Sequence, residues 1–185
     1  NNRERGSKMG LDMYFTAAKT SFGGYEHNKG TQEAETFDAI IAASSFPREV
    51  VQDSVEVRAR VGYLRKANAI HAWLVKHIQG GVDDCRTAYF SPEKIAELRD
   101  AVRQILDTVV KGEPSNEHGY ETYPDLTVDA ELAKELRPTW EGFFFVSYEI
   151  DEWYVNDLET ADTFLTNMLE HEGLKDCDFY YHSSW

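Results

Sequence analysis

The segment YLRKANAIH carries polar side chains whose types and spacing suit the binding of an anion. The apolar periodicity predicts a helix over Tyr63–Gln79, and steps of three place Arg65, Asn68 and His71 along one side of it. Arg65 and Lys66 would lie in its first turn, where the helix dipole favours an anion. This cluster can bind a phosphate or carboxylate, with His71 as acid or base. The alternative is that His71 is a hydrogen-bonded, half-buried residue and that Arg65 pairs with acidic residues of the C-terminal part.

Asp83, Asp84 and Cys85 follow the two glycines that end this predicted helix. Adjacent carboxylates in a loop can bind Mg²⁺ or Ca²⁺, but two carboxylates supply fewer oxygens than such a cation needs. A nucleophilic Cys85 needs a nearby histidine, either His71 or His77 on the preceding helix. The alternative is a capping and turn role for this segment.

Three more carboxylates, Glu149, Asp151 and Glu152, stand at the end of the β-prone segment GFFFVSYEI (142–150). Paired carboxylates at the end of a strand suit acid–base catalysis or metal binding. The alternative is the preference of a helix N-terminus for negative charge, with Asp151 as the N-cap of a helix that runs to Glu172.

The chain closes on the aromatic sequence FYYHSSW. We expect a final strand here, with Trp185 largely buried. His182 and Ser183 have no third residue at a spacing that would complete a catalytic triad, so closure of the sheet is the alternative role of this segment.

Sequence signatures of cofactor and metal sites are missing. There is no GxxxxGK[ST], GxGxxG, HExxH or GxSxG motif. The two cysteines, Cys85 and Cys177, belong to no CxxC or Cys/His cluster. The sequence therefore predicts neither a bound metal nor a cofactor.

Charge is distributed unevenly along the chain. The formal net charge is −14, and residues 112–185 hold 18 acidic but only 3 basic side chains. Direct binding of nucleic acid is disfavoured, because it requires cations that displace counterions from phosphates. An acidic region can instead attract a basic partner. No apolar run approaches the ~20 residues of a membrane-spanning helix, and the N-terminus shows no hydrophobic signal segment, so we expect a cytoplasmic protein that does not enter membranes.

The elements that must position these residues mix strands and helices without a regular βαβ rhythm. This order predicts an α+β fold, a mainly antiparallel sheet with helices packed on one face, in a single domain over 9–185 that follows a tag or disordered extension at 1–8. Strands are expected at 11–16, 55–61, 142–150 and 179–185, and helices at 33–43, 63–79, 92–111, 128–136 and 151–172. Ser91 is expected to cap the helix at 92–111 and Thr127 the helix at 128–136. The apolar stripe of the helix at 92–111 is expected at Ile95, Leu98, Val102, Ile105 and Val109.

The junction between the second strand and its helix gathers four cations, Arg58, Arg60, Arg65 and Lys66. Because the acidic C-terminal third must fold against the rest of the chain, we expect carboxylates among 151–157 to face this junction.

Several segments together resemble a family of small proteins of bacteriophages, prophages and bacterial mobile DNA. The segments are MGLDMYF, YLRKANAIHAWLV, GGVDDC, PTWEGFFFVSYEIDEWYVNDL and FYYHSSW. The resemblance implies an accessory, cytoplasmic protein of a mobile element and assigns no catalytic residue.

Two main functions are compatible with these features, and a virion or assembly component is the remaining alternative. The first is a non-enzymatic accessory protein that binds a host protein or a small anionic ligand through an acidic, aromatic-rich surface. The second is a small enzyme for a phosphorylated or nucleotide-like substrate, with His71 as acid or base beside Asp84 or Asp151. The candidate ligand-binding residues are Tyr63, Arg65, Lys66, Asn68, His71, Asp84 and Asp151. The most informative observation is whether Tyr63, Arg65, His71, Asp84 and Asp151 line one cavity.

Overall fold

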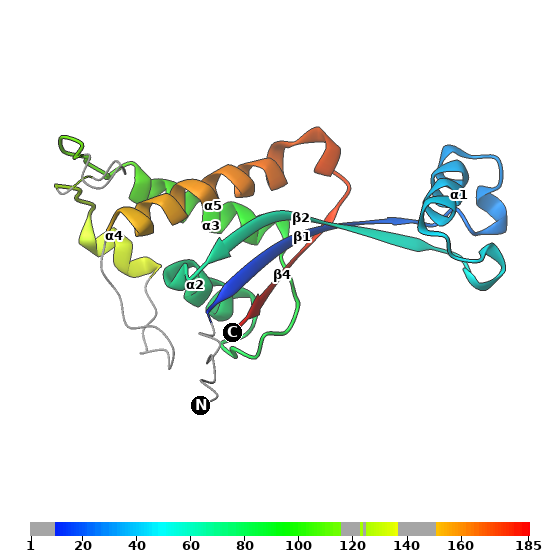
Figure 1. Cartoon of the computed structure of the whole chain (residues 1–185), viewed down its shortest axis with the longest axis horizontal. Coiled ribbons are helices and arrows are strands. Elements are labelled where there is room, and N and C mark those ends of the chain that lie inside the picture. The colour runs from blue at the N-terminus through cyan, green and yellow to red at the C-terminus, as the bar shows by residue number, and fades with distance from the viewer. Residues whose placement is uncertain (1–9, 116–122, 124, 137–150) are drawn as a thin grey trace, which may run out of the picture.

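A computed structural model describes residues 10–115, 123, 125–136 and 151–185 of the chain (Figure 1). The predicted extension at 1–8, the predicted strand at 142–150 and Glu149 lie outside the described residues.

Four antiparallel strands form one sheet in the order β2-β1-β4-β3. The strands are β1 (Asp12–Ser21), β2 (Val55–Arg65), β3 (Ala88–Tyr89) and β4 (Asp178–Ser184). The first and last segments of the described chain are therefore neighbours at the centre of the sheet. This arrangement confirms the predicted α+β class.

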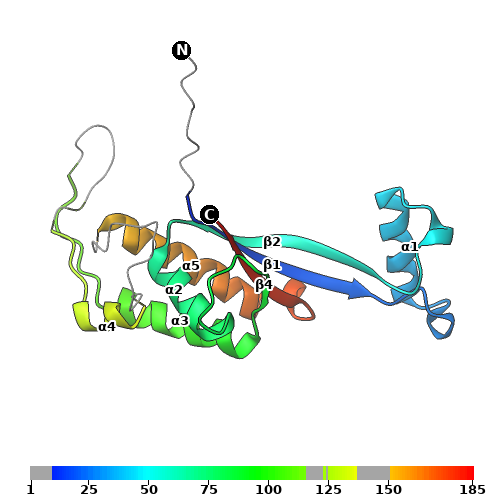
Figure 2. The same ribbon diagram turned by 90° about the horizontal axis from the view of Figure 1, so that it is seen from below.

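Helices cover one face of this sheet (Figure 2). The described α-helices are α1 (Gln32–Ser44), α2 (Asn68–Ile78), α3 (Pro92–Leu106), α4 (Ala130–Glu135) and α5 (Glu152–Glu170). Short 3-10 helices occupy Glu26–Asn28, Arg48–Val50 and Glu172–Leu174. Within the described part of the chain, none of the helices has both the length and the apolar character that crossing a bilayer requires.

The core lies between the sheet and helices α2, α3 and α5. Alternation along β1 directs Met13 and Phe15 to the helices, and both are fully buried. The ring of Phe15 packs 4.5 Å from the ring of Phe164 on α5. On α3 the buried stripe is Ile95, Leu98, Val102 and Ile105, as predicted, but the helix ends at Leu106 and does not reach Val109.

Side-chain caps set the starts of the two longest helices, as predicted. Ser91 accepts a hydrogen bond from the Lys94 amide, and Pro92 follows at the first helical position. Asp151 accepts one from the Tyr154 amide at 2.9 Å. The predicted cap of α4 was wrong, because Asp129 rather than Thr127 accepts the amides at its start.

Ion pairs join the acidic helix α5 to the segment that contains α3. Their partners are Arg103 with Asp162 at 2.6 Å, Arg99 with Glu170 at 2.9 Å and Lys111 with Glu159 at 2.8 Å. The acidic C-terminal third thus packs against the cations of α3 and Lys111.

β1 and β2 continue beyond the rest of the sheet as a two-stranded ribbon (Figure 1). β4 pairs with β1 only as far as Ala18. The ribbon ends in a tip of residues 22–53 that contains α1 and has its own buried residues, Phe37 and Ile41.

The predicted helix start at Tyr63 was wrong. Tyr63 and Arg65 belong to β2, where they pair with Tyr14 and Asp12 of β1. Lys66 then adopts the left-handed conformation, with φ of 61°, and α2 begins only at Asn68. Cross-strand pairing, which the sequence of this segment does not display, extends the strand at the expense of the helix.

Candidate functional site

The face of the sheet opposite the helices carries aromatic and basic side chains. Successive residues of a strand point to opposite faces, so the neighbours of the buried β1 residues project away from the helices. The same alternation in β4 buries Phe179, Tyr181 and Ser183 and leaves the residues between them half-buried. This open face includes Tyr14 and Thr16 from β1, Arg58, Arg60 and Tyr63 from β2, Tyr89 from β3, and Tyr180, His182 and Ser184 from β4.

A shallow pocket of about 510 Å³ lies on this open face. Its lining residues are Tyr14, Thr16, Arg58, Ala59, Arg60, Thr87, Tyr180, Tyr181, His182 and Ser184. Two of them are arginines and none carries a carboxylate, although the chain as a whole has a net charge of −14. The volume lies within the ~300–1,000 Å³ typical of small-molecule sites.

Tyr14 is at the centre of one ring stack in the pocket. Its ring and that of His182 are 4.8 Å apart and inclined by 19°. The Arg60 guanidinium carbon lies 4.6 Å from the centre of the Tyr14 ring and 5.8 Å from that of Tyr63. Arg60 makes no ion pair with any residue that the structure describes, so aromatic rings are the contacts of its charge.

Arg58 and Tyr180 form a second stack beside the first. The Arg58 guanidinium carbon lies 5.0 Å from the centre of the Tyr180 ring. Tyr180 in turn meets Tyr89 edge-on, with ring centres 5.9 Å apart. Arg58 also donates to Glu56, and this hydrogen bond raises the pKa of Arg58, which therefore remains charged.

A β-bulge brings Arg60 and Tyr63 to the same face. β1 pairs Phe15 with Gly62 but Thr16 with Arg60, so Val61 is the extra residue of β2. Without the bulge, residues three apart on a strand would project to opposite faces. The bulge therefore places Arg60 and Tyr63 together, next to Tyr14.

The structure disperses the seven candidate ligand-binding residues and does not gather them in one cavity. Tyr63 and Arg65 are on the open face beside the pocket, and both contact Asp12, which accepts from the Tyr63 hydroxyl and pairs with Arg65 at 3.9 Å. Lys66 lies between β2 and α2, and its backbone amide donates to the carbonyl of Leu11, just before β1.

The other members of the set belong to the helical layer or the loop beside it. Asn68 opens α2, and its buried Oδ1 has no hydrogen-bond donor among the described residues. Asp84 pairs with Arg86 at 3.6 Å, and Asp151 caps α5.

His71 is buried in the helical layer, and both of its ring nitrogens are hydrogen-bonded. Its exposed fraction is 8%. Nδ1 lies 2.6 Å from the hydroxyl of Tyr181, and Nε2 lies 3.0 Å from Oδ2 of Asp83. Burial raises the pKa of Tyr181 far above its ordinary value, so the hydroxyl keeps its proton. Nε2–H then donates to Asp83, and the acidic partner of His71 is Asp83 rather than Asp84 or Asp151.

The indole Nε1 of Trp185 donates to the other oxygen of Asp83 at 3.2 Å. The side chain of Trp185 is 38% exposed, so its predicted burial was wrong. It lies over the loop beside β4 instead of inside the core.

The ion pairs of the four-cation junction do not have the expected carboxylates at 151–157 as partners. Arg58 pairs with Glu56 of the same strand, and Arg65 pairs with Asp12 of the neighbouring strand β1. Among the described residues no group of three His, Cys, Asp or Glu side chains could hold a metal ion, and Cys85 and Cys177 are not bonded to each other.

Sequence reasoning overlooked most of the pocket. Tyr14, Arg58 and Arg60 alternate with apolar residues in strands that were predicted, and His182 was considered only as a triad member. The signal that could have found them is this alternation in three strands, since polar residues on one face of a half-buried sheet gather in space.

No family model, curated protein or solved structure matches the chain.

Proposed function

We propose that this chain is a non-enzymatic accessory binding protein of a phage or other mobile element, which acts in the host cytoplasm and holds a small anionic ligand on the open face of its sheet. One observation carries the proposal. The pocket contains Arg58 and Arg60 and no carboxylate, in a strongly acidic chain. Arg58 pairs with Glu56 outside the lining, but Arg60 has no carboxylate partner among the described residues. Arginines are the usual means by which proteins bind phosphates and carboxylates.

Binding has more support than catalysis. In the enzyme alternative His71 acts as acid or base, but its side chain is buried on the helical side of the sheet and already contacts Tyr181 and Asp83. A general acid or base must reach the substrate directly or through one water. His71 is also not among the residues that line the pocket.

The ligand proposal is tested by thermal unfolding of the full chain with inorganic pyrophosphate, citrate and AMP. A ligand of the native state at about 100 times its Kd should stabilise it by about 2.7 kcal/mol. We expect at least one compound to raise the melting temperature of the wild type and not that of the double variant Arg58→Gln/Arg60→Gln. A wild type that none of the three stabilises would contradict the proposal.

Arg48→Gln is the matched control for these substitutions. Arg48 is also exposed and stacked on an aromatic ring, 4.8 Å from the centre of Phe37, but it lies on the tip. Arg48→Gln removes one positive charge, as each of the two pocket substitutions does, and should leave the ligand response intact.

A second candidate function, contact with a host protein, is favoured by the tip. Residues 22–53 carry six acidic and two basic side chains, and Phe46 and Val50 there are 64% and 65% exposed. A projecting surface that is both acidic and apolar suits a basic partner with an apolar contact.

The tip contact is tested by replacing residues 22–54, which join the paired residues Ser21 and Val55, with Asn-Gly, a sequence suited to a two-residue hairpin turn. We expect the shortened protein to keep its fold and its ligand response but to lose capture of a basic host protein that the wild type retains. Phe46→Ser should weaken the same capture. Equal capture by the shortened protein would exclude the tip as the contact.

A further inference from the structure

We infer that the anion bound on the open face is a nucleotide unit, whose base stacks on the pocket rings while its phosphate contacts Arg60. This inference rests on the proposed function and adds the chemistry of the ligand. It comes from a combination that a simple anion site does not need, namely aromatic rings from β1 and β4 beside two arginines of β2.

The aromatic groups of the pocket are placed for stacking. Tyr14, Tyr180 and His182 are half-buried, so each is held by the sheet while part of its surface remains accessible. Tyr14 and His182 already form a nearly parallel pair. Aromatic side chains on the open face of an antiparallel sheet are a recurrent platform for nucleobases, because every base presents a flat π-surface.

The arginines add a means of exposing these rings. In the free protein the Arg60 guanidinium covers Tyr14, and that of Arg58 covers Tyr180. A phosphate attracts a guanidinium more strongly than a ring does in an exposed setting. A bound phosphate would draw Arg60 off the Tyr14 ring and free that surface for the base, so the two halves of a nucleotide would bind cooperatively.

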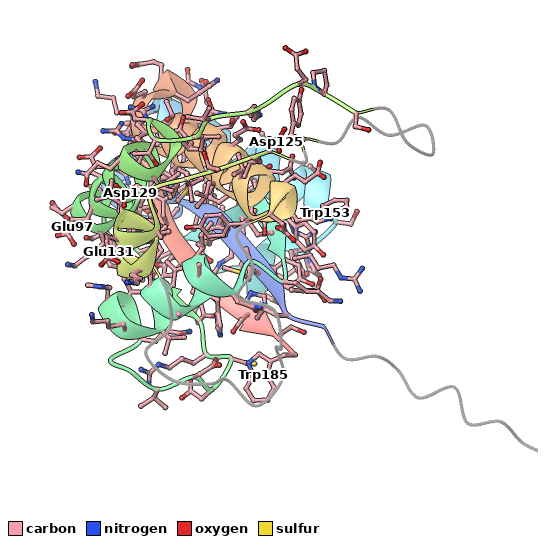
Figure 3. The ribbon with its side chains drawn as sticks, turned by 90° about the vertical axis from the view of Figure 1, so that its left-hand side faces the viewer. Glu97, Asp125, Asp129, Glu131, Trp153 and Trp185 are labelled. Carbon is pink, nitrogen blue, oxygen red and sulfur yellow. The ribbon has the colours of Figure 1, made fainter. Side chains whose placement is uncertain are left out.

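Charge around the pocket limits the length of the ligand. Glu56 lies near the start of β2, and Asp12 of β1 lies opposite the end of β2, so a carboxylate stands on each side of the arginines. The carboxylates of Glu97, Asp129 and Glu131 gather on α3 and α4, in the helical layer away from the open face (Figure 3). A long polyanion would extend past the carboxylate-free lining and be repelled by Glu56 and Asp12, whereas one or two nucleotides need not extend that far.

The experiment is a calorimetric titration of the full chain with AMP, and with two compounds that each lack one half of it, ribose 5-phosphate and adenosine. We expect AMP to bind at least about tenfold more tightly than either fragment, since a stacked base contributes about that factor. Equal affinities of AMP and ribose 5-phosphate would overturn the nucleotide inference and leave the anion function standing. If pyrophosphate and citrate fail together with AMP, the proposed function falls as well.

Variants locate the site. Arg60→Gln and Tyr14→Leu should each weaken AMP binding by at least about fivefold. Their matched controls are Arg48→Gln and Tyr25→Leu on the tip, where Tyr25 stacks on His27 with ring centres 5.5 Å apart. The controls should bind AMP as the wild type does. Unchanged binding by Arg60→Gln and Tyr14→Leu, in proteins with wild-type circular dichroism spectra, would overturn the site.

A parallel titration with a single-stranded oligoadenylate of about eight nucleotides separates two sources of the nucleotide unit. Affinity similar to that of AMP would indicate a free nucleotide, which the acidity of the chain favours. Affinity that rises steeply with length and falls with salt would indicate single-stranded nucleic acid. An oligonucleotide that binds equally well to Arg60→Gln would show that the open face is not its site.

Discussion

The imidazole Nδ1 of His71 lies 2.6 Å from the hydroxyl oxygen of Tyr181, although 110 residues separate them in sequence. The contact belongs to a series of side-chain hydrogen bonds that continues from His71 to Asp83 and from Asp83 to Trp185. It connects α2, the loop that follows α2, and the end of β4. These hydrogen bonds explain how the titratable side chain of His71 is accommodated in the helical layer, since both of its ring nitrogens have a partner.

Tyr181→Phe should destabilise the protein, because it removes the hydroxyl and leaves Nδ1 of His71 buried without a partner. We expect a loss of about 1–3 kcal/mol in the free energy of unfolding, measured in urea at neutral pH. Tyr180→Phe, at the neighbouring residue on the open face, is the control and should cost less than about 0.5 kcal/mol. Equal effects of the two substitutions would show that the hydrogen bond to His71 has no special weight.

Asp157→Asn should stabilise the protein at neutral pH and not in acid. Burial, and then the charge of Asp151, raises the pKa of Asp157 to about 6 from an ordinary 3.8. Between these values the native state binds more protons than the unfolded state, so the free energy of unfolding falls as pH rises through this range. Because asparagine is neutral throughout, its advantage should grow from near zero below about pH 4 to about 1–3 kcal/mol at pH 7.

Urea unfolding at several pH values measures this difference. Asp176→Asn changes an exposed aspartate and serves as the control, with no such pH-dependent gain. A constant difference between Asp157→Asn and the wild type from acid to neutral pH would contradict a raised pKa at Asp157.

The parts of the fold that sequence predicted well are those with local causes. Ser91 and Asp151 cap helices through side chains within three residues of the amides they accept, so a short stretch of sequence contains the whole signal. The segment at Tyr63 shows the opposite case. Its apolar spacing fits a helix, but pairing with β1, a long-range contact, makes it a strand.

The pocket depended on information that no local pattern holds. Its rings and arginines come from β1, β2 and β4, and only the order of the strands brings Tyr14 next to His182. The bulge in β2 also reverses which residues face outward, so alternation counted from Arg58 would assign Tyr63 to the core. The sequence therefore predicted residues near the site, Tyr63 and Arg65, without predicting the site itself.

Gly62→Ala should be strongly destabilising for its size. An added Cβ at Gly62 would lie 2.7 Å from ring carbons of Phe164, which is itself packed in the core against Phe15. Overpacking of this kind costs about 1–3 kcal/mol. Gly10→Ala is the matched control, since its Cβ would meet only ordinary contacts at 3.5 Å. The Phe164→Leu background tests the cause, because its smaller side chain should relieve the clash. If Gly62→Ala costs as much stability in that background as in the wild type, the clash is not the cause.

Trp185 should contribute less to stability than a core tryptophan. Its side chain is 38% exposed, and its indole N–H donates to Asp83, which keeps the Nε2–H of His71 as a second donor. We expect Trp185→Ala to cost about 1–2 kcal/mol in the free energy of unfolding, and Trp185→Phe, which removes the donor but keeps a ring, to cost less. Truncation of a buried tryptophan costs about 3–5 kcal/mol instead. A urea-measured loss in that upper range for Trp185→Ala, with little loss for Trp185→Phe, would mean that the ring is held in the core and that the bond to Asp83 is secondary.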